Sequence, residues 1–222
     1  MKGVHPPWIM GDDLHATLLR WLNEEQLNPK PQDDERALVH WLVRYPPGPN
    51  GHAFNIVHPK GRDLIAISSM TRVDAGQQNE MKEHSKADIE QWQDWVHSIR
   101  LSLIDGGVDW GIHVGGDKSK GDGPLQAFNV SEPIWLDGLS KNNLMQALRR
   151  LWLAKLGVIH EIKHNYGAGS GEPGPVDDFE RKKKEMARDK PKSKSSSKQK
   201  DSEVEMDDSG SFGSSFDKSE WA

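Results

Sequence analysis

The chain has 222 residues with a formal net charge of -5, and 34% of its residues are hydrophobic. That hydrophobic share is low for a chain that folds throughout, so we expect part of it to be unstructured. Cysteine is absent, which excludes disulfides and thiolate metal sites, and the modest net charge indicates no particular class of partner.

Apolar periodicity over the first 70 residues predicts one helix followed by three strands. Asp12 and Asp13 are expected to cap the helix, and the proline-rich stretch 28–31 ends it. Apolar residues then alternate with polar ones, and short turns rich in glycine and proline separate the runs. We therefore expect an antiparallel meander of three strands over residues 37–45, 52–58 and 64–70.

A second helix and two more strands are predicted after a polar stretch. Ser85 and Asp88 match a capping box, and the helix that follows has apolar residues three or four positions apart as far as Leu103. Alternation over residues 110–114 predicts a fourth strand. A glycine-rich loop then leads into a fifth strand over residues 125–136.

A last helix, over residues 141–164, completes the predicted domain. Ser140 precedes it as the expected N-cap, and its apolar residues again fall on one face. The fold class is therefore α+β: a two-layer domain over residues 1–166, with helices packed on an antiparallel sheet and the element order α-β-β-β-α-β-β-α.

The composition changes at residue 167. From there to the end of the chain, glycine, proline, serine and charged residues dominate. Such a segment cannot bury enough apolar surface to fold, so we expect a disordered tail over residues 167–222. The tail is basic over residues 181–200 and acidic over residues 201–222. Its acidic end carries three aromatic residues that suit a short partner-docking peptide: Phe212, Phe216 and Trp221.

Five short stretches carry a resemblance to known proteins: residues 18–22, 45–46, 58–59, 136–140 and 143–145. Through these stretches and the element order, the domain resembles the fold of bacterial type III secretion chaperones. It resembles more closely an uncharacterised archaeal family thought to share that fold. The secretion chaperones are homodimers that wrap an extended segment of another protein. The resemblance therefore implies a non-enzymatic protein-binding or chaperone-like module, a homodimer with an unknown protein partner and no cofactor.

One motif points to a different chemistry. His160, Glu161 and His164 form an H-E-x-x-H pattern, in which two histidines one helical turn apart hold Zn²⁺ and the glutamate serves a hydrolase as general base. Three features count against it. Ser170 stands where the metzincins have a third histidine, Lys163 places a cation between the ligands, and the motif lies at the end of a helix. We therefore expect no catalytic residue and no metal site, with a zinc-dependent hydrolase as the alternative.

The basic run 181–200 suggests a second alternative, a nucleic-acid-associated protein. The run lacks the interleaved aromatic residues that stack on bases, and the acidic block after it would compete for its lysines. Nucleic acid is therefore not the favoured partner. No apolar stretch is long enough for a signal sequence or a membrane span, so we expect a cytoplasmic protein without membrane association.

Overall fold

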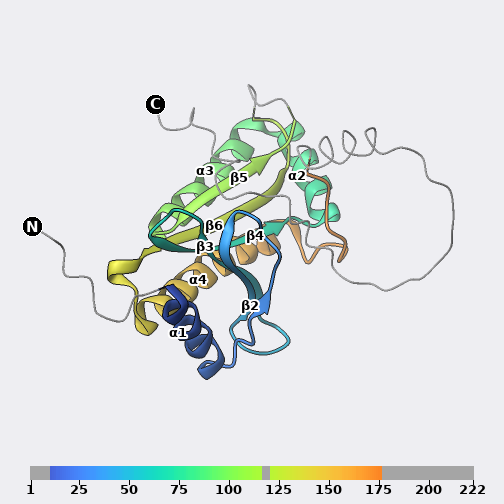
Figure 1. Ribbon diagram of the computed structural model, residues 1–222. Coiled ribbons are helices and arrows are strands. Elements are labelled where there is room, and N and C mark those ends of the chain that lie inside the picture. The colour runs from blue at the N-terminus through green and yellow to red at the C-terminus, as the bar shows by residue number, and fades with distance from the viewer. Residues whose placement is uncertain (1–10, 117–120, 177–222) are drawn as a thin grey trace, which may run out of the picture. The chain divides into compact units, whose positions relative to one another are not determined.

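The computed structural model describes residues 11–116 and 121–176, which form one sheet with helices packed against it (Figure 1). The chain divides into two compact units, Met1–Asp177 and Asp178–Ala222, and every described residue belongs to the first unit. The predicted basic and acidic blocks therefore lie outside the described residues.

Six strands form a single antiparallel sheet in the order β1-β2-β3-β4-β6-β5. β2, β3 and β4 are the predicted meander, which is confirmed, and the alternating residues of β2 are buried on one face as expected. The short β1 is not predicted, because two residues, one of them proline, carry no alternation. The strands span Lys30–Pro31 (β1), Ala37–Tyr45 (β2), His52–Pro59 (β3), Leu64–Arg72 (β4), Asp109–Val114 (β5) and Leu125–Trp135 (β6).

The pairing of β4 with β6 joins the meander to the second half of the domain. β6 runs antiparallel to β4 along the whole length of β4, from Trp135 opposite Leu64 to Ala127 opposite Arg72. β5 forms a hairpin with β6 and is the last strand of the sheet. The described part of the β5–β6 turn, residues 115–116 and 121–124, therefore lies at the end of the sheet where β4 also finishes.

The helices share one hydrophobic core with a single face of the sheet. α1 (Gly11–Glu24), α3 (Ile89–Asp105) and α4 (Lys141–Tyr166) each bury an apolar stripe there, and the 3-10 turn Leu136–Gly138 leads from β6 into α4. Burying one leucine contributes about 1.5–3 kcal/mol, so these stripes supply much of the stability. The two-layer α+β class predicted from the sequence is confirmed.

Two predictions about the segment between β4 and α3 are wrong. Residues expected to lie between elements form a further helix, α2 (Ala75–Ala87). The capping box does not form, because Asp88 itself is the N-cap of α3 and accepts a hydrogen bond from the backbone N–H of Gln91 at 3.0 Å. Apolar periodicity misses α2 because only Met81 among its buried residues is apolar; the others are Gln77, Gln78 and Ser85.

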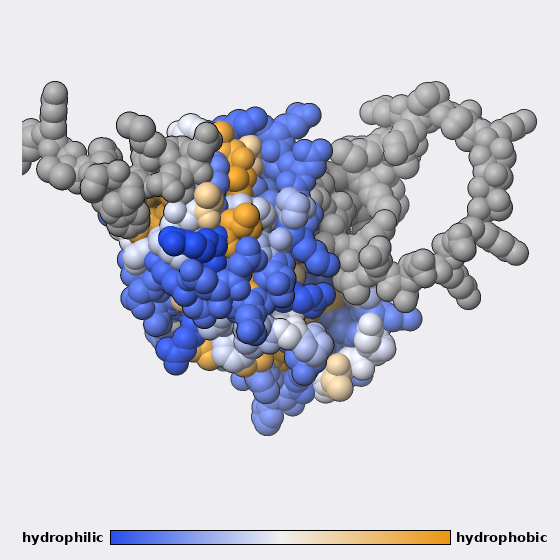
Figure 2. Space-filling model, turned by 60° about the horizontal axis from the view of Figure 1, so that its bottom comes forward, coloured by the Kyte–Doolittle hydropathy of each residue, from blue (hydrophilic) through white to orange (hydrophobic). Residues whose placement is uncertain are grey.

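The face of the domain seen in Figure 2 is mainly hydrophilic, and its hydrophobic residues lie in small, separate patches. Among the described residues, the large apolar side chains with the greatest exposure are Ile104, Trp135 and Leu38, at 55%, 54% and 52%. Within residues 11–116 and 121–176, no helix combines the length and the apolar character that crossing a membrane requires.

A histidine pair connects α1 to β3. His15 Nε2 and His58 Nδ1 are 2.9 Å apart, and His58 Nε2 lies 3.2 Å from the backbone carbonyl oxygen of Arg62. If Nε2 of a neutral His58 donates to that carbonyl, its Nδ1 is free to accept from His15. Burial lowers the pKa of His58, and the neighbouring His15 lowers it further. The folded protein therefore favours the neutral form of His58.

The free energy of unfolding should consequently fall as the pH drops below about 6.5. The unfolded chain binds a proton at His58 with the usual pKa of 6.5, whereas the folded chain binds it only at lower pH, so acid favours unfolding until the folded form is protonated too. Urea unfolding between about pH 5 and about pH 8 measures this loss. His58→Gln should reduce the loss, whereas His97→Gln, at an exposed position of α3, should not. An equal fall in the free energy of unfolding in the unmodified chain and in both variants would show that His58 does not cause it.

Candidate binding site

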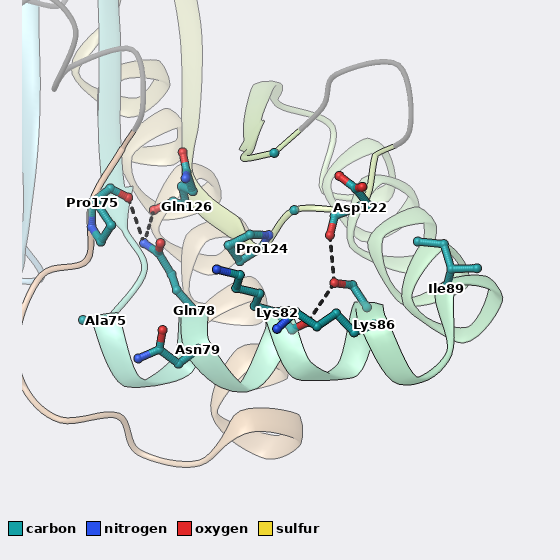
Figure 3. A pocket seen from close by; sticks show the side chains of 13 residues that line it. Ala75, Gln78, Asn79, Lys82, Lys86, Ile89, Asp122, Pro124, Gln126 and Pro175 are labelled. Carbon is teal, nitrogen blue, oxygen red and sulfur yellow. Dashed lines mark hydrogen bonds between the residues drawn. The ribbon is translucent and has the colours of Figure 1, made fainter.

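A groove runs along α2 beside the end of β4 (Figure 3). We call it the α2 groove, and its cavity has a volume of about 1020 Å³. α2 forms one wall, and the β5–β6 turn with the start of β6 forms the other. Figure 3 shows Gln78 and Lys82 of α2 directed toward Pro124 and Gln126 on the opposite wall.

Side chains from two helices hold the β5–β6 turn beside the groove. Ser85 Oγ of α2 lies 2.8 Å from the carbonyl oxygen of Asp122, and Trp92 Nε1 of α3 donates to the carbonyl of Gly121 at 3.1 Å. The turn closes tightly at Gly123, where a Cβ atom would lie 1.8 Å from a backbone oxygen across the turn, so only glycine fits. The second wall is therefore fixed from both neighbouring helices.

Gln78 connects three backbone segments at one end of the groove. The residue is 4% exposed. Its side-chain amide nitrogen lies 3.1 Å from the carbonyl oxygens of both Val73 and Pro175, and 3.4 Å from that of Gln126. Because buried amide groups need acceptors, Gln78 fixes the relative positions of β4, β6 and the segment that follows α4.

The ten residues after α4, which we call the 167–176 segment, lie against α2 and the end of β4. Val176 is 3% exposed, and Gln77 Nε2 donates to the carbonyl of Gly167 at 2.6 Å. The composition of these residues predicts that they belong to the disordered tail, but the described chain stays on the domain as far as Val176. Two backbone hydrogen bonds of 3.0 Å hold the segment: Ala75 N–H to Glu172 O, and Gly174 N–H to Val73 O.

Asp74 fastens the 167–176 segment to the start of α2. Its Oδ1 accepts hydrogen bonds from the backbone N–H of Gly76 at 2.7 Å and of Ser170 at 2.8 Å. The Ser170 hydroxyl lies 3.1 Å from each carboxylate oxygen. The bond from the Ser170 N–H is the main cause that lowers the pKa of Asp74 to about 2, so the carboxylate stays charged down to strongly acidic pH.

Two lysines give the α2 wall a positive charge. Lys82 and Lys86 line the groove one helical turn apart on α2. Lys86 Nζ lies 2.7 Å from a carboxylate oxygen of Glu83, but both side chains are exposed, and such pairs are weak. Asp122 also lines the groove, with a carboxylate oxygen beside Gly116 of the β5–β6 turn. The larger apolar groups of the lining belong to Ile89, Pro124 and Pro175.

Residues 14–162 match the model of a family described as Uncharacterized conserved protein (DUF2299). The chain belongs to this family. A crystal structure of an uncharacterized protein from Methanothermobacter thermautotrophicus is also similar, with a TM-score of 0.59 and 28% sequence identity. That match covers 69% of this chain and 99% of the other. No curated protein shows significant similarity to the chain.

These matches confirm the expected place in an uncharacterised family and add a structural relative from an archaeon. The family match begins in α1 and ends in α4, so it includes both walls of the groove but not the 167–176 segment. The matches do not bear on the resemblance to type III secretion chaperones, on partner binding or on homodimer formation. Those statements stay predictions.

The structure places the H-E-x-x-H residues on α4, where His160, Glu161 and His164 are all exposed. Glu161 Oε1 accepts a hydrogen bond from Asn165 at 3.0 Å. In the described part of the chain, no group of three or more histidine, cysteine or carboxylate side chains could hold a metal ion. The zinc hydrolase remains an untested alternative. The candidate docking residues lie outside the described residues: Phe212, Phe216 and Trp221.

Sequence reasoning does not find the α2 groove, because its walls come from separate segments and from an unpredicted helix. One usable signal is Asp74, since an acidic residue before thirteen proline-free residues is typical of a helix N-cap. A second missed residue is Lys155, which falls between Leu151 and Val158 in the apolar stripe of α4 and is 6% exposed. A lysine within an apolar stripe is itself a signal, because lysine is almost never fully buried without a partner.

Replacing Asp74 with asparagine should loosen the 167–176 segment. The amide keeps the shape of the side chain but loses the charge and one acceptor oxygen that hold Ser170. Hydrogen–deuterium exchange should become faster in peptides that cover this segment. Glu83→Gln, which removes an exposed carboxylate whose described partner is Lys86, should leave the exchange unchanged. Identical exchange in the two variants would refute this role for Asp74.

Proposed function

We propose that the chain is a non-enzymatic protein-binding module, and that the α2 groove holds an extended acidic segment of a partner protein. The observation that carries the proposal is the groove itself: a cavity of about 1020 Å³ with two lysines on one wall and a polypeptide segment bound next to it. Cavities that hold ligands have volumes of about 300–1,000 Å³, so the groove is large enough for several residues of a partner. The resemblance to chaperones that wrap extended segments points the same way.

The 167–176 segment supports this mode of binding. Its backbone is aligned with the end of β4 by two hydrogen bonds, and the side-chain amides of Gln77 and Gln78 donate to its carbonyl groups. Peptides that add to the edge of a sheet bind in a similar way. Their backbone hydrogen bonds supply the affinity, and pockets for their side chains supply the selectivity. Pro175 belongs both to this segment and to the groove lining. An extended partner in the groove would therefore bind next to the 167–176 segment, which already makes backbone hydrogen bonds beside the end of β4.

The charge of the groove supports an acidic partner. Lys82 and Lys86 both line the cavity, which has one carboxylate in its lining, Asp122, and the lining also includes Asn79. Attraction between these lysines and acidic residues would speed encounter and select against basic segments. The attraction acts over about 8–10 Å at physiological salt, so binding should weaken as salt is added.

Binding of a labelled probe peptide tests this proposal. The full chain is titrated with a peptide of about ten residues that alternates glutamate and leucine, a length and pattern suited to extended binding. Fluorescence anisotropy should show saturable binding, and amide chemical shifts should change at Gln78, Lys82 and Gly123. Lys82→Glu should weaken the affinity by about tenfold or more, because it places a like charge beside the bound carboxylates.

The matched control is Lys30→Glu. It makes the same change in charge on β1, at the far edge of the strand order from the strands that flank the groove. This variant should bind the peptide as the unmodified chain does. Equal affinities in all three proteins, or equal binding of a peptide with lysine in place of glutamate, would refute the proposed partner chemistry.

The homodimer implied by the resemblance is part of the same proposal. Leu101 and Ile104 on α3 and Leu153 on α4 are exposed by 47%, 55% and 46%. Leu101 and Ile104 are one helical turn apart on α3, and Leu153 precedes Ala154, whose Cβ would lie 3.3 Å from a Cβ added at Gly106, just after α3. Neighbouring exposed apolar side chains are typical of an interface, and a second copy of the chain would bury them.

Light scattering on the full chain tests this. The mass should be twice the chain mass of 25.0 kDa at high protein concentration. Ile104→Glu should shift the mass toward that of one chain, because it buries a charge in the interface. Leu38→Glu, at an exposed position of β2, should not change the mass. A mass of one chain at every concentration would exclude the homodimer.

A further inference from the structure

Lys155 carries a charge into the interface between α4 and the sheet. The residue is 6% exposed, and its Nζ donates to the hydroxyl of Ser69 on β4 at 2.7 Å. Nζ also lies 5.6 Å from the centroid of the Phe54 ring on β3. Among the described residues, no carboxylate forms an ion pair with this lysine. Buried charges are normally paired, so the missing counter-ion requires an explanation.

The hydrogen bonds around Lys155 are incomplete. An ammonium group has three N–H donors, and only Ser69 accepts from Nζ within the described part of the chain. The Ser69 hydroxyl itself donates to the carbonyl of Ala53 at 2.6 Å, so its geometry is fixed. Burial lowers the pKa of Lys155 to about 8, which still leaves the side chain mostly protonated at neutral pH. A positive charge with two free donors is therefore held between α4 and the sheet.

Two more buried polar atoms without a partner belong to the neighbouring strands. They are His52 Nδ1 on β3 and Thr71 Oγ1 on β4. Thr71 and Ser69 lie on the same face of β4, because successive side chains alternate. The register that pairs Asn55 with Ser68, carried further along the strands, brings His52 opposite Thr71. Unsatisfied polar atoms are rare in protein interiors, and two of the four among the described residues belong to the strands that Lys155 packs against.

A second cation, Lys163, acts on His52. The pKa of His52 is lowered by burial first, and then by the charges of Lys155 and Lys163, so both lysines act on this histidine. Lys163 is exposed on α4, and His52 and Thr71 are half-buried. The cluster therefore combines the buried Lys155 with an exposed lysine, Lys163, and the charges of both reach His52.

We propose that Lys155, His52 and Thr71 form a binding site for a small oxyanion, of the phosphate or carboxylate class, with Lys163 at its entrance. Such an anion would supply the missing counter-ion. Its oxygen atoms would accept from the two free donors of Lys155, from the Thr71 hydroxyl and from the ring N–H of His52. Ser69 positions Lys155 and does not need to contact the anion. The site is separate from the α2 groove, and none of its residues lines that cavity.

Thermal unfolding of the full chain with added sodium phosphate, sulfate or acetate tests the site against sodium chloride at the same ionic strength. At least one oxyanion should raise the Tm in a saturable way, because a ligand that binds the folded state stabilises it. A response to acetate alone assigns the carboxylate class, and a response to phosphate and sulfate alone assigns the phosphate class. No rise over chloride with any of the three would overturn the proposal.

Two variants identify the site. Lys155→Met should raise the Tm without added anion, because it removes a buried charge, and should abolish the rise caused by the anion. Thr71→Val keeps the shape of the side chain and should weaken the anion affinity by about tenfold, the worth of one hydrogen bond to a charged group. Lys30→Met, at an exposed lysine of β1 that belongs to neither site, should respond as the unmodified chain does. A rise that persists in Lys155→Met would show binding elsewhere or a general salt effect, and would refute the site.

The pH dependence gives an independent readout. Among the described residues, His52 on β3 is a titratable group that interacts with both Lys155 and Lys163 of α4. Deprotonation of Lys155 removes the central charge, so the affinity for sulfate, which keeps its charge over this range, should fall steeply between about pH 7 and about pH 9. An exposed lysine would hold its proton over the same range. A flat affinity across this range would contradict a site built on Lys155.

Discussion

The pairing of β4 with β6 is the constraint on which the architecture and both candidate sites depend. It places the end of β4 opposite the start of β6, so α2 leaves the sheet beside the β5–β6 turn, and the α2 groove forms between them. The same strand β4 contributes Ser69 and Thr71 to the face that α4 covers. The end of β4 therefore lies beside the α2 groove, and one face of β4 contributes to the cluster around Lys155. A slip of β4 by one residue in this register would turn Ser69 and Thr71 to the opposite face of the sheet.

Most of the fold follows from short-range patterns in the sequence. Alternating residues in β2 and the three-and-four spacing in α3 and α4 predict elements whose burial the structure confirms. The elements that the sequence does not predict are α2, whose buried residues are mostly polar, and β1, which is too short to show alternation. α2 buries Gln77, Gln78 and Ser85, whose hydrogen bonds reach residues up to 97 positions away, and no local pattern encodes such partners. β1 is defined by its pairing with β2 and not by its own two residues.

The candidate sites were less predictable than the fold, for a related reason. The H-E-x-x-H motif draws attention to the exposed face of α4, where the residues share a spacing. Lys155, on the buried stripe of the same helix, has no motif, and its significance depends on groups from β3 and β4 that the fold brings together. A buried cation lowers stability, and natural proteins accept such a loss mainly where function depends on it. A lysine that interrupts an apolar stripe is therefore a more useful sequence signal here than the five-residue motif.

The hydrogen bonds of the 167–176 segment decide where a stable fragment of this chain can end. A fragment cut after Tyr166 would retain every helix and strand that the structure describes. Gln77 would nevertheless lose its described acceptor, Gln78 would lose one of three, and the surface under Val176 would be uncovered. The shortest piece that keeps all the described contacts of α2 ends at Val176, ten residues beyond α4. A label or fused protein attached at that point would begin next to Pro175, at the mouth of the groove, and would report on its occupancy.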